Sequence, residues 1–240
     1  MTSRAGDTQT IVVRAEAADA DVLSQVIADA FHDLAPSRWL IANPAGRRAI
    51  FPAYFGLYVK HALDTGVVHT NADRTAVALW QPVSDSGPAQ PADYERELTA
   101  ATQPWTQRFL VFDAALDLHH PVGTAHHYLA ILAVRPDRQG QGIGTALLRA
   151  HHVTLDWNGT PAYLEASDRR TRHLYLVHGY RDCGDPIQLP GGPRMYPMVR
   201  QAGRTVTGGQ AAGTSAGTAA AIGDAAQAVA ERSDTAGQAL

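Results

Sequence analysis

A glycine-rich stretch between two apolar segments is the feature that most constrains the fold of this 240-residue chain. The stretch is RPDRQGQGIGTALLRAHH (135–152), and the apolar run before it, YLAILAV (128–134), is typical of a buried strand. Residues 145–157 repeat apolar side chains at helical spacing, and AYLEAS (162–167) predicts a second strand. A strand, a loop, a helix and a strand in this order form a βαβ unit, which predicts a mixed α/β fold.

The three glycines of this stretch, Gly140, Gly142 and Gly144, recur at every second position before the predicted helix. Because glycine has no Cβ, consecutive amides can converge there on an anion, and the helix N-terminus adds free N–H groups. The pattern therefore predicts a phosphate-binding loop, most naturally for a pyrophosphate. A plain flexible turn is the alternative, but such a turn rarely needs three glycines.

Of two other phosphate ligands, a nucleoside triphosphate is excluded and a dinucleotide fits the loop less well. A P-loop needs a lysine after its last glycine, whereas Thr145 follows Gly144 here and the one lysine is Lys60. A dinucleotide fingerprint would end in glycine or alanine where Thr145 stands, and it would follow its strand without the intervening RPDRQ. Glu165 does lie where a ribose-binding acid is expected, so a dinucleotide-dependent oxidoreductase stays an alternative.

Residues 11–200 are predicted to form one domain, between a flexible N-terminus (1–10) and a disordered tail (201–240). The tail is rich in Gly, Ala, Ser and Thr, and it has too few large apolar side chains to offset the entropy of ordering. Outside the βαβ unit, periodicity and turn residues predict a strand at 11–16, helices at 19–31, 46–66, 94–120 (interrupted near Pro104) and 171–179, a hairpin at 67–82, and antiparallel strands at 180–190 and 193–201.

The charge and the cysteine content exclude several classes of function. A net charge of −3 provides no basic surface for nucleic acid or an anionic membrane. Cys183 is the single cysteine, so neither an intrachain disulfide nor a cysteine-cluster metal site can form. Three pairs of adjacent histidines (119–120, 126–127 and 151–152) are no chelates by themselves, because neighbouring side chains diverge. With no membrane span and no signal-peptide pattern, we expect a cytoplasmic protein without a metal.

Two stretches of the chain resemble signatures of the GNAT superfamily of N-acetyltransferases. The form V-x-P-x-x-Q-G-x-G-I-G-x-x-L is matched from Val134 to Leu147, and YLEASDRRTRHLYLVHGYR (163–181) resembles the second signature. That signature ends in Tyr-x-x-x-Gly-Phe, which stands here as Tyr175 to Tyr180. Within the superfamily the chain most resembles the puromycin N-acetyltransferase-like group, whose AVAVW strand is similar to residues 76–80.

The resemblance implies an α/β (α+β) GNAT fold, in which helices flank a curved mixed sheet that splays between two central strands. Acetyl-CoA would be the co-substrate, with its pantetheine arm in the splay and its pyrophosphate on the amides of the loop. The implied cofactor-binding residues are Leu132, Ala133, Val134, Gln139, Gly140, Gln141, Gly142, Ile143, Gly144, Thr145 and Thr171, the last of which stands where the family often has asparagine.

The resemblance also implies direct transfer, in a ternary complex, to an amine of a small molecule such as an antibiotic or another natural product. Tyr175 matches the family's tyrosine acid, which would give a proton to the departing thiolate. Glu165 can act as the base for the ammonium, or it can bind a cationic substrate. A protein or peptide N-acetyltransferase and a non-catalytic acyl-CoA-binding module are alternatives, and a monomer or a homodimer is expected.

Two further groups of side chains have both a functional and a structural interpretation. Arginines in the loop at 169–172 can meet the ribose phosphate of the cofactor or form a solvated loop; they are Arg169, Arg170 and Arg172. Aromatic side chains in the N-terminal half can line an acceptor pocket or fill the core, and we expect the core; they are Trp39, Phe51, Tyr54, Phe55 and Tyr58.

Overall fold

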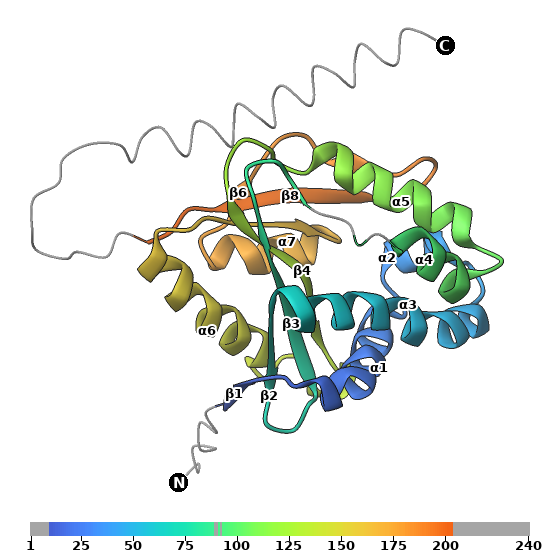
Figure 1. Ribbon diagram of the computed structural model, residues 1–240, viewed down its shortest axis with the longest axis horizontal. Coiled ribbons are helices and arrows are strands. Elements are labelled where there is room, and N and C mark those ends of the chain that lie inside the picture. The colour runs from blue at the N-terminus through green and yellow to red at the C-terminus, as the bar shows by residue number, and fades with distance from the viewer. Residues whose placement is uncertain (1–9, 89–90, 92, 204–240) are drawn as a thin grey trace, which may run out of the picture.

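The computed structural model describes residues 10–88, 91 and 93–203 of the chain (Figure 1). The apolar and β-branched runs of these residues form strands, which join into an eight-stranded mixed sheet. Its order is β1-β2-β3-β4-β5-β8-β6, with β7 paired to β8 off this path. The strands are β1 (Val12–Arg14), β2 (Val67–Asn71), β3 (Ala76–Val83), β4 (His126–Val134), β5 (Ala162–Ala166), β6 (Arg181–Asp182), β7 (Ile187–Gln188) and β8 (Arg194–Arg200).

The sheet opens between its two central strands, β4 and β5. These strands are parallel neighbours, but they pair only at His127 with Ala162 and at Tyr128 with Tyr163. Farther along, β4 continues to Val134 in antiparallel pairing with β3 alone. The predicted splay between two central strands is therefore confirmed, and it leaves one edge of β4 facing a gap in the sheet.

A β-bulge redirects β4 shortly after it separates from β5. Leu79 pairs with Ile131 and Trp80 pairs with Leu129, so Ala130 is the extra residue. Ala130 and Ile131 consequently pack on the same side of the sheet, although neighbouring residues of a regular strand alternate. A bulge increases local twist and re-aims the adjacent backbone groups, which here border the splay.

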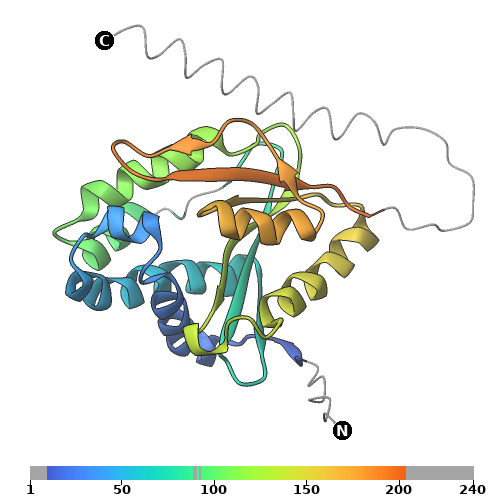
Figure 2. The ribbon, with the colours of Figure 1, turned by 180° about the vertical axis from the view of Figure 1, so that it is seen from behind.

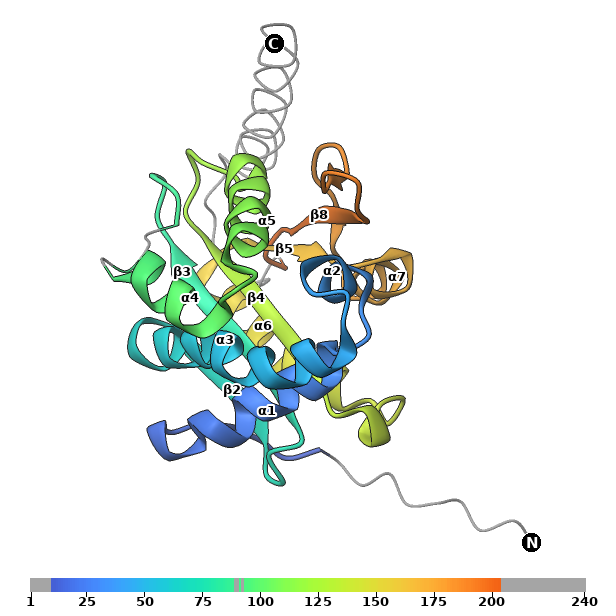
Figure 3. The same ribbon diagram turned by 90° about the vertical axis from the view of Figure 1, so that its right-hand side faces the viewer.

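Helices cover both faces of the sheet (Figures 1 and 3). On one face α1 and α3 pack against β3, with α4 against α3 and α5 against α4, and on the other face α6 packs against β2, β3 and β4. α7 lies beside β5. The helices are α1 (Ala20–Phe31), α2 (Ala35–Leu40), α3 (Pro44–Thr65), α4 (Tyr94–Thr102), α5 (Thr106–His119), α6 (Ile143–Asn158) and α7 (Arg169–Val177), with one-turn 3-10 helices η1 (Ala17–Asp19) and η2 (Pro136–Arg138).

The structure differs from the predicted elements in two places. The short helix α2 was not predicted, because its 6 residues are too few for a helical repeat to show. It is held by tertiary contact, since the Trp39 indole donates at 3.0 Å to the carbonyl of Pro190, in the loop between β7 and β8. Figure 2 shows the ribbon of β7 and β8 beside α5. The predicted strand 180–190 forms β6 and β7 instead, separated where Gly184 takes a φ of +79°. The predicted flexible N-terminus and disordered tail lie outside the described residues, apart from Thr10 and residues 201–203.

Candidate active site

The splay, the glycine loop and α7 enclose a cavity of about 540 Å³. Its walls include β4 from Tyr128 to Val134, the start of α6, and the side of α7 that carries Tyr175. Every residue that the sequence predicted for the site lines this cavity, with the exception of Gln141. The fold thus brings the predicted cofactor loop, Glu165 and Tyr175 around one space, whose volume is in the range of small-molecule sites.

The glycine loop presents unobstructed backbone amides to this cavity. Gly140 and Gly142 have φ values of +76° and +78°, a region that favours glycine, and a Cβ at either would project into open space. The first helical hydrogen bond of α6 runs from the Ala146 amide to the Gly142 carbonyl at 3.0 Å. The amides of residues 143–145 therefore have no acceptor within the helix, as at any helix start, and all three residues line the cavity. This arrangement fits a diphosphate, which takes several N–H donors and gains from the helix dipole.

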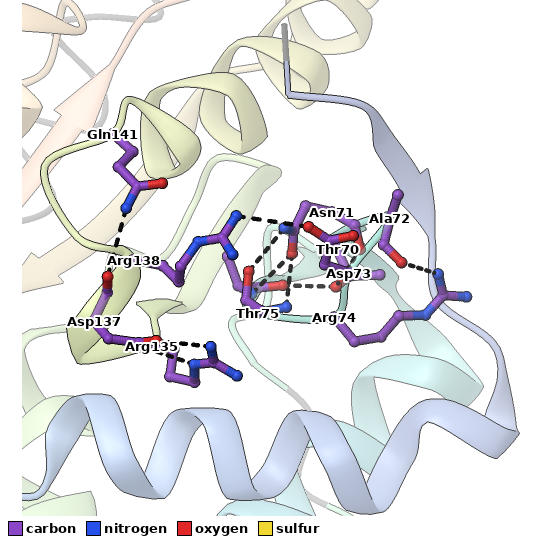
Figure 4. A network of polar contacts seen from close by, with 11 residues as sticks. Thr70, Asn71, Ala72, Asp73, Arg74, Thr75, Arg135, Asp137, Arg138 and Gln141 are labelled. Atoms are coloured by element: carbon purple, nitrogen blue, oxygen red, sulfur yellow. Dashed lines mark hydrogen bonds and ion pairs between the residues drawn. The ribbon is translucent and has the colours of Figure 1, made fainter. Parts of the chain in front are cut away.

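Two glutamine side chains stabilise the loop through hydrogen bonds to backbone carbonyls. Gln139 donates from Nε2 to the Val134 carbonyl at 3.0 Å, which ties the loop to the last residue of β4. Gln141 donates to the Asp137 carbonyl at 3.5 Å (Figure 4). Gln141 does not line the cavity. The structure therefore gives the side chain of Gln141 a place in the loop framework, and only its backbone amide stays a predicted cofactor contact.

The β2–β3 turn supports the loop from the neighbouring side. Asn71 accepts the amide hydrogens of Thr75 and Ala76 at 2.8 and 3.0 Å, which fixes the turn. From this turn Asp73 approaches Arg138 with an N–O distance of 3.6 Å (Figure 4). Arg138 also lines the cavity, so it adds a positive charge beside the glycine loop. Sequence reasoning missed Arg138 because the motif leaves its position unspecified.

Glu165 on β5 is a buried carboxylate with one hydrogen-bonded oxygen. Oε2 accepts a hydrogen bond from the Tyr128 hydroxyl at 2.8 Å, whereas Oε1 is buried and has no hydrogen-bond partner among the described residues. Burial is the largest of the effects on the pKa of Glu165 and raises it to about 7, although the hydroxyls of Tyr128 and Tyr163 act to lower it. A carboxyl group that titrates near neutral pH in a cavity has the property required of a general base.

Tyr175 reaches the cavity from α7 and is only 8% exposed. Its hydroxyl forms no hydrogen bond with the described residues, and burial raises the pKa of Tyr175 above its ordinary value. The phenol is therefore protonated at neutral pH and can donate to a ligand. Thr171 also lines the cavity, but its side chain closes a capping box with Asp168, accepting that residue's amide at 3.1 Å. This hydroxyl is consequently engaged in starting α7.

The structure shows which of the loop arginines and which of the aromatic residues singled out in the sequence lie at the cavity. Arg170 lines the cavity, whereas Arg172 pairs with Asp182 beside a smaller pocket that Arg169 also borders. Among the aromatic residues, Tyr54, Phe55 and Tyr58 line the cavity and also belong to or pack against the helical core. Phe51 is fully buried in that core, and Trp39 holds α2 in place.

Histidines gather in the fold without forming a chelate. His151 of α6 lies between His69 and His127, at N–N distances of 3.2 and 3.0 Å. Because His151 uses a different ring nitrogen toward each neighbour, the three rings form a chain and do not converge on one point. Within the described ranges, no group of three or more His, Cys, Asp or Glu side chains could hold a metal ion, and no helix is long and apolar enough to cross a bilayer.

Comparisons with known proteins agree with this geometry. Residues 107–182 match the family profile described as acetyltransferase (GNAT) domain, a range that contains the glycine loop, Glu165 and Tyr175. The chain is similar to a solved structure described as histone acetyltransferase HPA2 and related acetyltransferase from Corynebacterium glutamicum, with 23% identity and a TM-score of 0.61 over 82% of this chain and 99% of that one. It is also similar to arylalkylamine N-acetyltransferase 2 from Aedes aegypti, with 12% identity and a TM-score of 0.53 over 80% and 98%. These similarities confirm the predicted GNAT fold.

Proposed function

We propose that this chain is an acyltransferase, as its matched domain and its fold indicate, and that it transfers an acetyl group from acetyl-CoA to the amine of a small molecule with an apolar body. The observation that carries the proposal is that one cavity joins the glycine loop to a buried carboxylate and a buried tyrosine. Both reactants can meet in this space, so transfer is direct, within a ternary complex. Holding two reactants in position can by itself supply most of the rate gain.

The loop and the edge of β4 form the cofactor side of the site. The amides of residues 143–145 would bind the pyrophosphate, and Arg138 would add a cation near the phosphates. The edge of β4 that no described strand pairs with, from Leu132 to Val134, would bind the amides of the pantetheine arm, next to the Val134 carbonyl that accepts from Gln139. When bound, acetyl-CoA supplies the thioester that the amine attacks.

Two side chains carry the proton transfers of the proposed reaction. Glu165 takes a proton from the ammonium form of the acceptor, and the neutral amine then attacks the thioester carbonyl. The new C–N bond forms as the C–S bond breaks, and the Tyr175 hydroxyl gives its proton to the departing sulfur. The second N–H proton, which the attacking nitrogen loses as it becomes an amide, restores the phenol. A base with a pKa of about 7 and a protonated phenol are both in the required state near neutral pH.

The acceptor side of the cavity is aromatic and nearly uncharged. Its acids are Glu165 and Asp168, and the Asp168 carboxylate already accepts the Thr171 amide at 2.7 Å. An apolar surrounding favours the neutral, nucleophilic form of an amine. A peptide backbone entering there would leave its polar groups without partners. The aromatic lining therefore favours a small apolar amine; it is formed by Phe31, Tyr54, Phe55, Tyr58, Phe112 and Tyr128.

The proposal is tested with a panel of acceptors at saturating acetyl-CoA, by following the release of the free thiol. We expect aryl- and alkylamines to exceed lysine-containing peptides in kcat/KM by at least about tenfold, since burying one aromatic ring contributes more than 1.4 kcal/mol. The resemblance to the puromycin N-acetyltransferase-like group adds antibiotics and other natural products to the panel. Preference for peptides or histone tails would instead favour a protein acetyltransferase, as the description of the Corynebacterium structure suggests.

Replacement of Tyr175 by phenylalanine separates an enzyme from a non-catalytic acyl-CoA-binding module. For Tyr175→Phe we expect kcat to fall about 10²-fold, the lower part of the usual range for a general acid or base. Affinity for CoA should stay unchanged, because the phenylalanine fills the same volume. The control is Tyr196→Phe on β8, which does not line the cavity. Equal turnover in Tyr175→Phe and the unmodified protein would contradict an acid at this position.

A further inference from the structure

Two buried histidines form a hydrogen-bonded chain that leads to Glu165. His120, at the end of α5, and His126, at the start of β4, are 4% and 1% exposed. Their Nε2 atoms lie 3.0 Å apart, and Nδ1 of His126 lies 2.9 Å from the Thr124 carbonyl oxygen. Nδ1 of His120 lies 4.0 Å from Oε1 of Glu165. These contacts place three titratable groups in one line inside the protein.

The Thr124 carbonyl fixes which nitrogens of this chain carry hydrogen. Burial lowers the pKa of both histidines, that of His120 to about 3, so each ring is neutral and has one N–H. A carbonyl can only accept, and therefore the hydrogen of His126 is on Nδ1 and its Nε2 is an acceptor. His120 must then donate from Nε2. It follows that Nδ1 of His120 presents a lone pair toward Glu165.

A lone pair facing Oε1 can accept a hydrogen bond from Glu165 only when the carboxyl group is protonated. The other oxygen, Oε2, already accepts from Tyr128, and Oε1 has no hydrogen-bond partner among the described residues. Neutral His120 and ionised Glu165 cannot form an ion pair or a hydrogen bond, because neither supplies a hydrogen between Nδ1 and Oε1. Once Glu165 carries a proton on Oε1, that hydrogen can point to Nδ1 of His120.

We propose that His120, oriented by His126, is a positioning residue that accepts a hydrogen bond from Glu165 after Glu165 has taken the proton of the substrate. The N–H bond of the ammonium breaks, an O–H bond forms on Oε1, and the proton stays on the carboxyl group. A small movement of the carboxyl group from the 4.0 Å separation closes the hydrogen bond. This inference rests on the proposed role of Glu165 as the base.

Some of the other groups around Glu165 lower its pKa and some raise it. The hydroxyls of Tyr128 on β4 and Tyr163 on β5 favour the carboxylate, whereas burial and Asp117 on α5 favour the neutral acid. His120 belongs with the second set, because a hydrogen bond to the neutral form raises the pKa of an acid. Removing the His120 acceptor should therefore lower the pKa of Glu165.

The pH dependence of kcat/KM tests this role in the variant His120→Phe. Phenylalanine keeps an aromatic ring against Tyr128 and Tyr163, which His120 contacts edge to face at centroid distances of 4.9 and 4.8 Å. We expect the acidic limb of the profile to move down by about one pH unit, together with a lower plateau. The matched control, His119→Phe, replaces the neighbouring histidine, whose Nδ1 contacts the Ala115 carbonyl, and should leave the limb in place. A uniform loss at every pH, without a shift of the limb, would show that His120 is only structural and would overturn the proposal.

The tautomers can be measured in the unmodified protein, which covers the case in which His120→Phe does not fold. Long-range ¹H–¹⁵N NMR spectra near neutral pH should show His120 with its hydrogen on Nε2 and His126 with its hydrogen on Nδ1. The opposite tautomer of His120, or a charged ring at either position, would overturn the proposal. This readout requires no acetyl transfer, so it is separable from the failure of Glu165 as the base, which Glu165→Gln reports.

Discussion

Replacement of Glu165 by glutamine is expected to reduce kcat/KM by about 10³-fold, within the usual range for loss of a general base. The glutamine amide fits the same space and its oxygen can still accept from the Tyr128 hydroxyl, but it cannot take a proton. The remaining activity should lose the acidic limb of the pH profile. In the unmodified protein, kcat/KM should rise about tenfold per pH unit up to about pH 7 and then level off.

The stability of the same variant provides an internal control. The raised pKa of Glu165 means that the folded protein binds this proton more tightly than the unfolded chain between pH 4.5 and about 7, so stability falls as the pH rises through that range. The variant Glu165→Gln should not lose stability over this pH range. At pH 8 its unfolding temperature should equal or exceed that of the unmodified protein. Glu97→Gln, at an exposed position of α4, should change neither property. If Glu165→Gln retained its activity together with the acidic limb of the pH profile, Glu165 would be excluded as the base.

Placing a carboxylate on the glycine loop is expected to abolish binding of CoA. For Gly142→Asp we expect the Kd for CoA to rise about 10³-fold, because two like charges about 4 Å apart repel by about 4 kcal/mol at an effective dielectric constant of 20. The fold should tolerate the change, since aspartate accepts a positive φ better than most residues and a Cβ at this position would meet open space. The loss of the thermal shift with CoA, or calorimetry, measures the effect.

Two matched variants separate charge from shape at this position. Gly142→Asn has nearly the same shape without the charge, and we expect it to weaken CoA binding at least about tenfold less than Gly142→Asp. Gly123→Asp places the same residue at a φ of +83°, also with open space around the Cβ, but outside the cavity lining, and it should bind CoA normally. If Asp and Asn at position 142 weaken binding equally, an anion is not bound at this loop.

Much of the cofactor side of the site is predictable from the sequence because its information is local. The apolar run before the loop, the spacing of Gly140 and Gly142, and the helix that follows all lie within about thirty residues. Local steric rules then decide the backbone, and the structure has these glycines at positive φ. Tyr175 and Glu165 were predicted from a second local pattern, and both line the cavity.

The sequence by itself determined the order of the elements, the glycine loop and the residue types at the reaction centre, since each depends on neighbours along the chain. Only the tertiary structure decided what surrounds them. Arg138 faces the cavity because the β2–β3 turn carries Asp73 to it, and the tyrosines of α3 line the cavity because α3 packs on the sheet. In the sequence, His120 and His126 belong to two separate histidine pairs. In the structure, the end of α5 and the start of β4 bring both histidines into one chain with Glu165. Contacts of this kind join residues far apart in the chain, and no local pattern encodes the distance between them.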